Sequence, residues 1–158
     1  MFVKTSLLQR LIQQIGGTAS VELALLSPLL LIMVTGLVEV GVAVIEATQV
    51  QVAAQAGALY AAKYGTGDLS KISAAITNAT STAGITASPS PTVYCGCASA
   101  SGVTSQGANC ATVCADGKLP GTYVSVSATI SHTGLLSSPY LSLSLPASFV
   151  GTSVIRIQ

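Results

Sequence analysis

Four cysteines have the clearest chemistry in this sequence, and they lie close together along the chain. Cys95 and Cys97 form a C-x-C pair, and Cys110 and Cys114 follow as C-x3-C. Neighbours in C-x-C rarely join each other, because so small a ring strains disulfide geometry. In an exported protein we therefore expect two disulfides, crossing or nested, that each link the first pair to the second. The alternative is a zinc site of four thiolates, although this spacing departs from the usual C-x2-C pairs.

Two carboxylates stand beside or inside the longest apolar run of the chain, Leu23 to Ile45. Glu22 lies at the front edge of the run, and Glu39 lies past its middle. A carboxylate inside a membrane is costly unless it has a partner, so both are candidate assembly contacts. Each carboxylate also has a simpler interpretation. For Glu22 it is a position at the level of the lipid headgroups, and for Glu39 it is contact with water near the outer end of the span.

The sequence lacks the residue sets that most enzymes need. The only histidine, His132, is expected at the surface, on the solvent side of a strand or just beyond it, with no acidic residue near it in sequence. That position does not suit a catalytic base. Asp68 and Asp116 are the only aspartates, too few for a metal site or a catalytic carboxylate pair. We therefore expect no catalytic residue, no cofactor and no metal site.

The composition points to a protein that stays near a membrane or packs into an assembly. Of the 158 residues, 50% are hydrophobic and only 7% are charged, and the mean hydropathy is +0.70. An ordinary soluble domain has about 25% charged residues. The net charge of +1 comes with no cluster of basic residues, so we expect no nucleic-acid partner.

The apolar run is long enough to span a bilayer, which takes about 20 apolar residues in a helix. The segment before it contains Lys4 and Arg10 and no acidic residue, and the next basic residue is Lys63. The positive-inside rule then places the N-terminus in the cytoplasm and the C-terminal part outside. The small-residue junction Gly16-Gly17 precedes the apolar run, whereas a secretory signal has its cleavage site after the apolar core. A cut there would leave the apolar run on the mature protein.

These features resemble the TadE-like family of minor pilins, or pseudopilins, from tight-adherence (Flp-type) type IV pilus systems. The matching positions are Gly17, the block Val21-Glu22-Leu23-Ala24, Pro28, and the run Gly36-Leu37-Val38-Glu39-Val40-Gly41. The chain differs at Leu23, where the family usually has an aromatic residue. The strong resemblance covers about residues 16–65.

The resemblance implies a structural and assembly role. A prepilin peptidase would cut between Gly17 and Thr18, and Glu22 would become the fifth residue of the mature chain. Its carboxylate would then pair with the amino terminus of a neighbouring subunit. The expected partners are other pilin or pseudopilin subunits and the pilus assembly machinery. The expected location is the bacterial inner membrane, as a single-pass protein. Two positions stay open, incorporation into a cell-surface adhesion pilus or retention in the membrane as part of the assembly platform. The alternative is an uncleaved membrane-anchored binding domain that presents the cysteine loop to a ligand.

The sequence predicts an α+β fold in three parts. These are a leader (1–17), a transmembrane and projecting helix (18–65), and an extracytoplasmic α+β domain with a disulfide loop (66–158). Pro28 is expected to kink the helix, with Ser27 satisfying a freed carbonyl group. Gly65 is expected to end it. Small residues at i+4 spacing, Ala53, Gly57 and Ala61, indicate close packing, either on the chain's own sheet or on another subunit.

After the long helix, the pattern predicts one short helix and a small antiparallel sheet. The helix is expected over residues 68–83, with Asp68 as its cap. Residues 122–133 alternate apolar and polar positions and predict a half-buried strand, and shorter or weaker strands are expected at 92–94, 141–145 and 153–158. The segment 98–121 is expected to be a loop held by the cysteines. Together these elements indicate a long N-terminal helix laid on the sheet, in pilin-like fashion.

Overall fold

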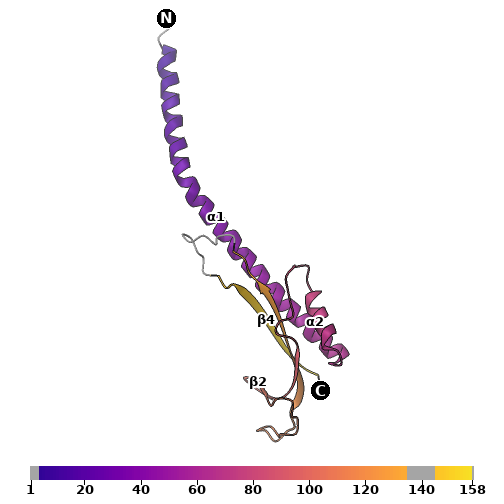
Figure 1. Ribbon diagram of the computed structural model, residues 1–158. Helices are drawn as coiled ribbons and strands as arrows, with labels where there is room; N and C mark the ends of the chain where they lie inside the picture. The colour runs from indigo at the N-terminus through magenta and orange to yellow at the C-terminus, as the bar shows by residue number, and fades with distance from the viewer. Residues whose placement is uncertain (1–3, 135–144, 158) are drawn as a thin grey trace. The chain divides into compact units, whose positions relative to one another are not determined.

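The computed structural model describes residues 4–134 and 145–157, and for residues 4–19 it describes the backbone alone. It has the α+β fold expected from the sequence (Figure 1). The elements are α1 (Lys4–Tyr64), α2 (Leu69–Thr77), β1 (Thr92–Ser99), β2 (Gly102–Ser105), β3 (Gly121–Ser131) and β4 (Ser148–Arg156). The described chain divides into two compact units, residues 4–41 and residues 42–134 with 145–157. We call the second the globular unit.

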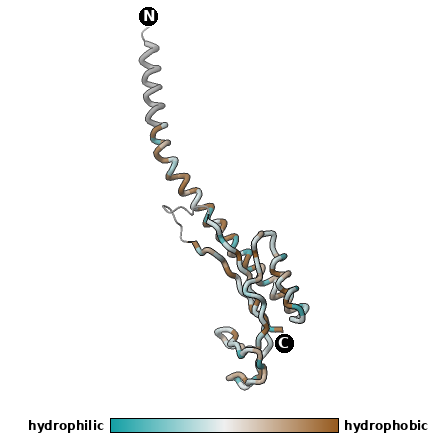
Figure 2. Tube along the Cα trace, viewed as in Figure 1, coloured by the Kyte–Doolittle hydropathy of each residue, from teal (hydrophilic) through white to brown (hydrophobic). Residues whose placement is uncertain are grey.

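In the first unit, α1 remains helical through Pro28. Proline has no N–H for the carbonyl four residues earlier. The hydroxyl of Ser27 donates to this carbonyl, that of Ala24, at 3.3 Å. The predicted role of Ser27 is therefore confirmed. Figure 2 shows how apolar residues dominate this part of the helix.

The globular unit is a four-stranded antiparallel sheet with helices packed against it. The strand order is β2-β1-β3-β4, and β3 pairs with β4 along nine residue pairs, from Tyr123–Arg156 to Ser131–Ser148. The predicted apolar face of β3 is confirmed, since its members are no more than 4% exposed, but the opposite face is less open than predicted, with Ser127 only 7% exposed. The members of the apolar face are Val124, Val126, Ala128 and Ile130. They form the core together with residues of α1 and α2.

Two glycines let α1 approach its neighbours closely. A Cβ at Gly57 would lie 2.5 Å from Ile76 Cγ1 of α2 and 2.8 Å from Val126 Cγ1 of β3. A Cβ at Gly151 of β4 would lie 2.6 Å from the carbonyl oxygen of Val50 of α1. The flanking residues of the small-residue row, Ala53 and Ala61, are fully buried. This row therefore packs within the chain itself.

The short helix α2 ends earlier than predicted. It covers Leu69–Thr77, and the backbone N–H of Asn78 closes it with a bond to the Ala74 carbonyl at 3.0 Å. The expected extension to residue 83 is wrong, because the Ser, Thr and Asn residues beyond Thr77 favour caps and turns over helix interiors. The predicted cap is confirmed, with Asp68 Oδ1 accepting from the Ser70 N–H at 3.0 Å.

The sheet is larger than the sequence pattern predicted. β1 extends to Ser99 and forms a hairpin with β2, in a segment expected to be loop. This hairpin was missed because its residues are mostly Cys, Gly, Ala and Ser, which give little strand signal. β4 begins at Ser148 instead of 153, since Gly151 marks a close approach of α1 and not a break. The extended segment expected at 141–145 lies, up to residue 144, outside the described residues.

Candidate functional site

The apolar surface of α1 is the most extensive candidate interaction surface of the described chain. By length and composition, the stretch Ser20–Tyr64 is the only described helix suited to crossing a membrane. Its most apolar window has a mean hydropathy of 2.3, and only 11% of that window is buried within the chain. Leu25 and Leu37, for example, are 75% and 72% exposed. This surface must be covered by lipid or by other helices.

The predicted carboxylates on α1 differ in exposure. Glu22 is exposed. Glu39 is 4% exposed and interacts with another group of the chain. The predicted cleavage residues Gly17 and Thr18 lie in the same helix, in the turn before Glu22. Of the two carboxylates, only Glu22 is therefore presented at the surface of the single chain.

In the globular unit, α1 keeps an apolar face on the side away from the core. Ile45, Val52 and Leu59 recur every seven residues and are 58%, 49% and 66% exposed. We call these three residues the outer stripe. Spacing of seven places residues on one side of a helix, as in helix–helix seams. The seven-residue spacing of this stripe is visible in the sequence, but the sequence analysis considered only the small-residue row on the buried side.

His132 lies just beyond β3, one of the two expected positions, but the prediction of a surface residue is wrong. Its side chain is 5% exposed, and Nδ1 lies 2.6 Å from Oε2 of Glu46, which is 18% exposed. The ring also contacts Phe149 edge-on, with centroids 5.5 Å apart. Nε2 has no hydrogen-bond partner among the described residues. The Glu46–His132 pair links α1 to the residue that follows β3.

The four cysteines form two crossing disulfides, Cys95–Cys110 and Cys97–Cys114. The Cα atoms are 5.2 and 5.7 Å apart in the two pairs. Backbone bonds add to this attachment: the Cys95 N–H donates to Gly107, and its carbonyl accepts from Gln106, both at 2.7 Å. The loop before β3 is thereby held against β1. The crossing pattern is one of the two arrangements that the spacing left open.

A long apolar helix that continues into a small disulfide-bonded α+β unit defines a pilin-like organisation. Residues 17–59 match the family model described as TadE-like protein. The match confirms the resemblance over this segment, which begins at Gly17 and ends within α1. No curated protein matches the chain. No solved structure matches it either.

Proposed function

We propose that this protein is a minor pilin or pseudopilin of a tight-adherence pilus, cut by a prepilin peptidase and assembled through α1. The observation that carries this proposal is the exposed apolar surface of α1. It extends past the length that a bilayer needs, into the outer stripe of the globular unit. A simple membrane anchor has no need of an apolar face beyond the bilayer.

The exposed carboxylate of Glu22 supports assembly through the front of the helix. Cleavage between Gly17 and Thr18 would create a positively charged amino terminus four residues before Glu22. In an apolar surrounding, this amino group on one subunit and Glu22 on the next would neutralise each other. The leader, with Lys4 and Arg10, would be removed, and it would stay in the cytoplasm before cleavage.

The outer stripe supports contact with a second helix outside the bilayer. Its opposite side is occupied, since Ala53, Gly57 and Ala61 pack on the chain's own core. Only the outer side is left for another subunit. In this arrangement one helix joins the globular unit on one side and neighbouring pilin-like helices on the other.

Processing is the experiment that separates this proposal from an uncleaved, membrane-anchored binding domain. The mass of the native protein is measured in a host with and without its prepilin peptidase. We expect the mature form to lack residues 1–17 only when the peptidase is present, and Gly17→Ala to block the cut. Gly41→Ala is the matched control, because an added Cβ there has no atom within 4 Å. An unchanged mass in both hosts contradicts the proposal.

Assembly is tested on the processed protein. Glu22→Ala is expected to be cut like the wild type but to enter pili poorly, because the neighbouring amino terminus loses its partner. Quantifying the protein in sheared pilus fractions against the cell membrane gives the result. Wild-type incorporation of Glu22→Ala would contradict the charge-pairing role while leaving the processing result intact.

A further inference from the structure

The connection from α2 to β1 contains a short Ser-Pro repeat, Ser88-Pro89-Ser90-Pro91. Both serines are exposed, whereas Pro91 is buried. A residue that precedes proline is restricted to extended backbone conformations, so both serines are held in extended chain. The repeat therefore presents two hydroxyl groups outside the helices and strands of the globular unit.

The chain on either side attaches the repeat to the sheet. Thr86 pairs with Thr129 of β3 through two backbone hydrogen bonds, each 2.9 Å long. The Thr129 hydroxyl also donates to the Ser88 carbonyl, at 2.6 Å. β1 begins two residues after Ser90. Ser90 therefore lies between two attachment points and is exposed at a defined position.

The Ser90 hydroxyl takes no part in holding the fold. Within residues 4–134 and 145–157, it has no hydrogen-bond partner. The hydroxyls of Thr86 and Thr129 differ, because both donate to backbone carbonyl groups. A substituent on the Ser90 oxygen would therefore break no internal hydrogen bond.

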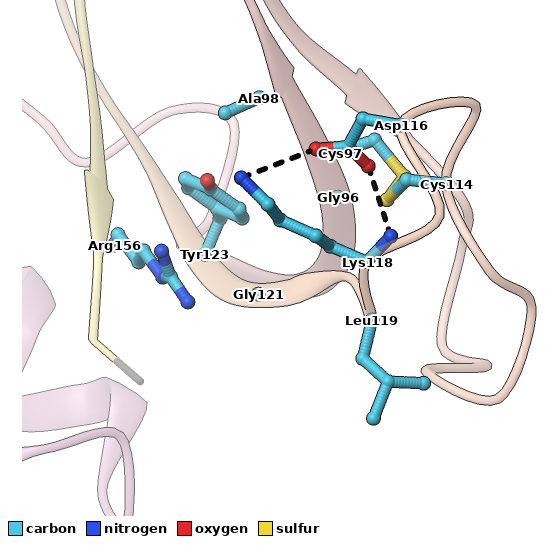
Figure 3. Close-up of a pocket in the computed structure, with 10 residues that line it drawn as sticks. All are labelled: Gly96, Cys97, Ala98, Cys114, Asp116, Lys118, Leu119, Gly121, Tyr123 and Arg156. Atoms are coloured by element: carbon cyan, nitrogen blue, oxygen red, sulfur yellow. Dashed lines mark hydrogen bonds and ion pairs between the residues drawn. A yellow bond between two sulfur atoms is a disulfide. The ribbon is translucent and has the colours of Figure 1, made fainter.

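The surface near this repeat has hydroxyl groups in place of charges. Between Lys71 and Asp116, the sequence has no Lys, Arg, Asp, Glu or His residue. The first two charged residues after this stretch contact each other, since Lys118 Nζ lies 3.8 Å from Asp116 Oδ2 (Figure 3). Charged side chains normally keep the surface of a soluble domain hydrated. This stretch lacks that usual means of hydration.

We propose that Ser90 is an O-glycosylation site, and that a sugar on its oxygen hydrates this charge-free surface. Segments rich in serine and threonine that also contain prolines are typical carriers of O-linked sugars. The inference rests on the placement of the globular unit outside the membrane, which is part of the proposed function.

The reaction needs a sugar donor of the lipid diphosphate class and a membrane transferase. The Ser90 hydroxyl oxygen attacks the anomeric carbon of the sugar, and a new C–O bond forms there. The bond from this carbon to the diphosphate oxygen breaks, so the lipid diphosphate leaves with the electron pair. The hydroxyl proton passes to a basic side chain of the transferase.

An N-linked sugar at Asn78 is the competing modification, and the structure favours it less. Asn78-Ala79-Thr80 has the N-x-T pattern of an N-glycosylation acceptor. The Thr80 hydroxyl is buried, however, and has no hydrogen-bond partner among the described residues. A transferase that recognises this hydroxyl would have to open the turn after α2, whereas Ser90 is already exposed.

The test is peptide mass spectrometry on the native protein, purified from the membrane of its own host. We expect the peptide that contains Ser90 to exceed the mass of its sequence by one or more sugar residues, and β-elimination to remove the addition. An unmodified Ser90, a phosphate there, or a sugar on Asn78 instead would overturn the proposal. The same spectra report whether residues 1–17 have been removed. A processed chain without sugar would refute this inference and leave the proposed function intact.

Variants locate the modification. Ser90→Ala is expected to abolish the added mass, and the protein is expected to fold as before because the lost hydroxyl has no partner in the described chain. Ser101→Ala is the matched control, since Ser101 is an exposed serine in the turn between β1 and β2 with no neighbouring proline. It is expected to keep the full addition. A Ser90→Ala protein that keeps the addition, or a Ser101→Ala protein that loses it, would refute the assignment.

Discussion

Glu46 and His132 form a buried contact, with Oε2 and Nδ1 only 2.6 Å apart, although 86 positions separate them in the sequence. Glu46 lies on α1 and His132 directly follows β3, so the contact joins the helix to the sheet. With His132 5% exposed and Glu46 18% exposed, water replaces neither partner readily. Loss of one partner therefore leaves a poorly solvated polar group.

Glu46→Ala is expected to lower the free energy of unfolding of the globular unit by about 1–3 kcal/mol, the cost of a buried group left without its partner. His132→Ala removes a buried ring as well and is expected to cost more. Thermal unfolding followed by near-ultraviolet circular dichroism measures both. Thr48→Ala, one half-turn further along the helix and exposed, is the control. A Glu46→Ala protein as stable as the control would contradict a stabilising role for this contact.

The sequence predicted those elements that are determined by the order of apolar and polar residues within the element itself. The long helix follows from its apolar length, and β3 follows from its strict alternation, because each of its residues faces either the core or the other side of the sheet. The Ser27 bond to Ala24 was predictable for a similar reason, since the donor and the freed carbonyl are local.

Contacts between distant segments were not predictable from pattern. Whether His132 meets Glu46 depends on how α1 lies across the sheet, which no local signal encodes. Gly151 resembles a strand breaker in the sequence, and only the nearby Val50 carbonyl explains it. The cysteine spacing allowed crossing and nested pairings alike, since both close similar loops.

Gly151→Ala is expected to destabilise the globular unit more than Gly57→Ala. At Gly151 the added methyl meets the backbone of α1, 2.6 Å from the Val50 carbonyl oxygen, and a backbone cannot turn aside. At Gly57 the nearest atoms belong to the side chains of Ile76 and Val126. Overpacking of this kind costs about 1–3 kcal/mol.

Chemical denaturation of the detergent-solubilised chain measures the order of these two variants. Gly67→Ala is the control, because an added Cβ at this loop position has no atom within 4 Å. The prediction is wrong if Gly151→Ala unfolds at the same denaturant concentration as the control, since α1 and β4 would then have room to separate.

Asp68 gives the N-terminus of α2 a pH dependence. The Ser70 hydroxyl, which donates to Oδ1 at 2.5 Å, is the main cause that holds the pKa of Asp68 below its usual 3.8. A carboxyl whose pKa is lower in the folded than in the unfolded state adds stability above the unfolded pKa. This stability is lost as the pH falls through the folded pKa.

The melting temperature of the wild type is therefore expected to exceed that of Asp68→Ala at neutral pH, and the difference is expected to shrink below pH 3.8. In a Ser70→Ala background, the loss of melting temperature caused by Asp68→Ala at neutral pH should be smaller, because the main cause of the lowered pKa of Asp68 is removed. A difference that stays constant from neutral to strongly acidic pH would show that the ionised form of Asp68 contributes nothing.

Val52→Glu and Leu59→Glu are expected to leave the globular unit folded but to exclude the protein from pili. Both side chains are about half or more exposed, at 49% and 66%, so a charge there disturbs no internal packing. In an assembled helix–helix seam, the same charge would be buried without a partner, which is strongly unfavourable.

Val113→Glu is the matched control, because this valine is 55% exposed but lies on the disulfide loop, away from the helix. Comparing each variant in sheared pilus fractions with its melting temperature separates assembly from folding. If all three variants enter pili equally, the outer stripe faces solvent or lipid, and the subunit contacts of α1 must be confined to the segment before Ile45.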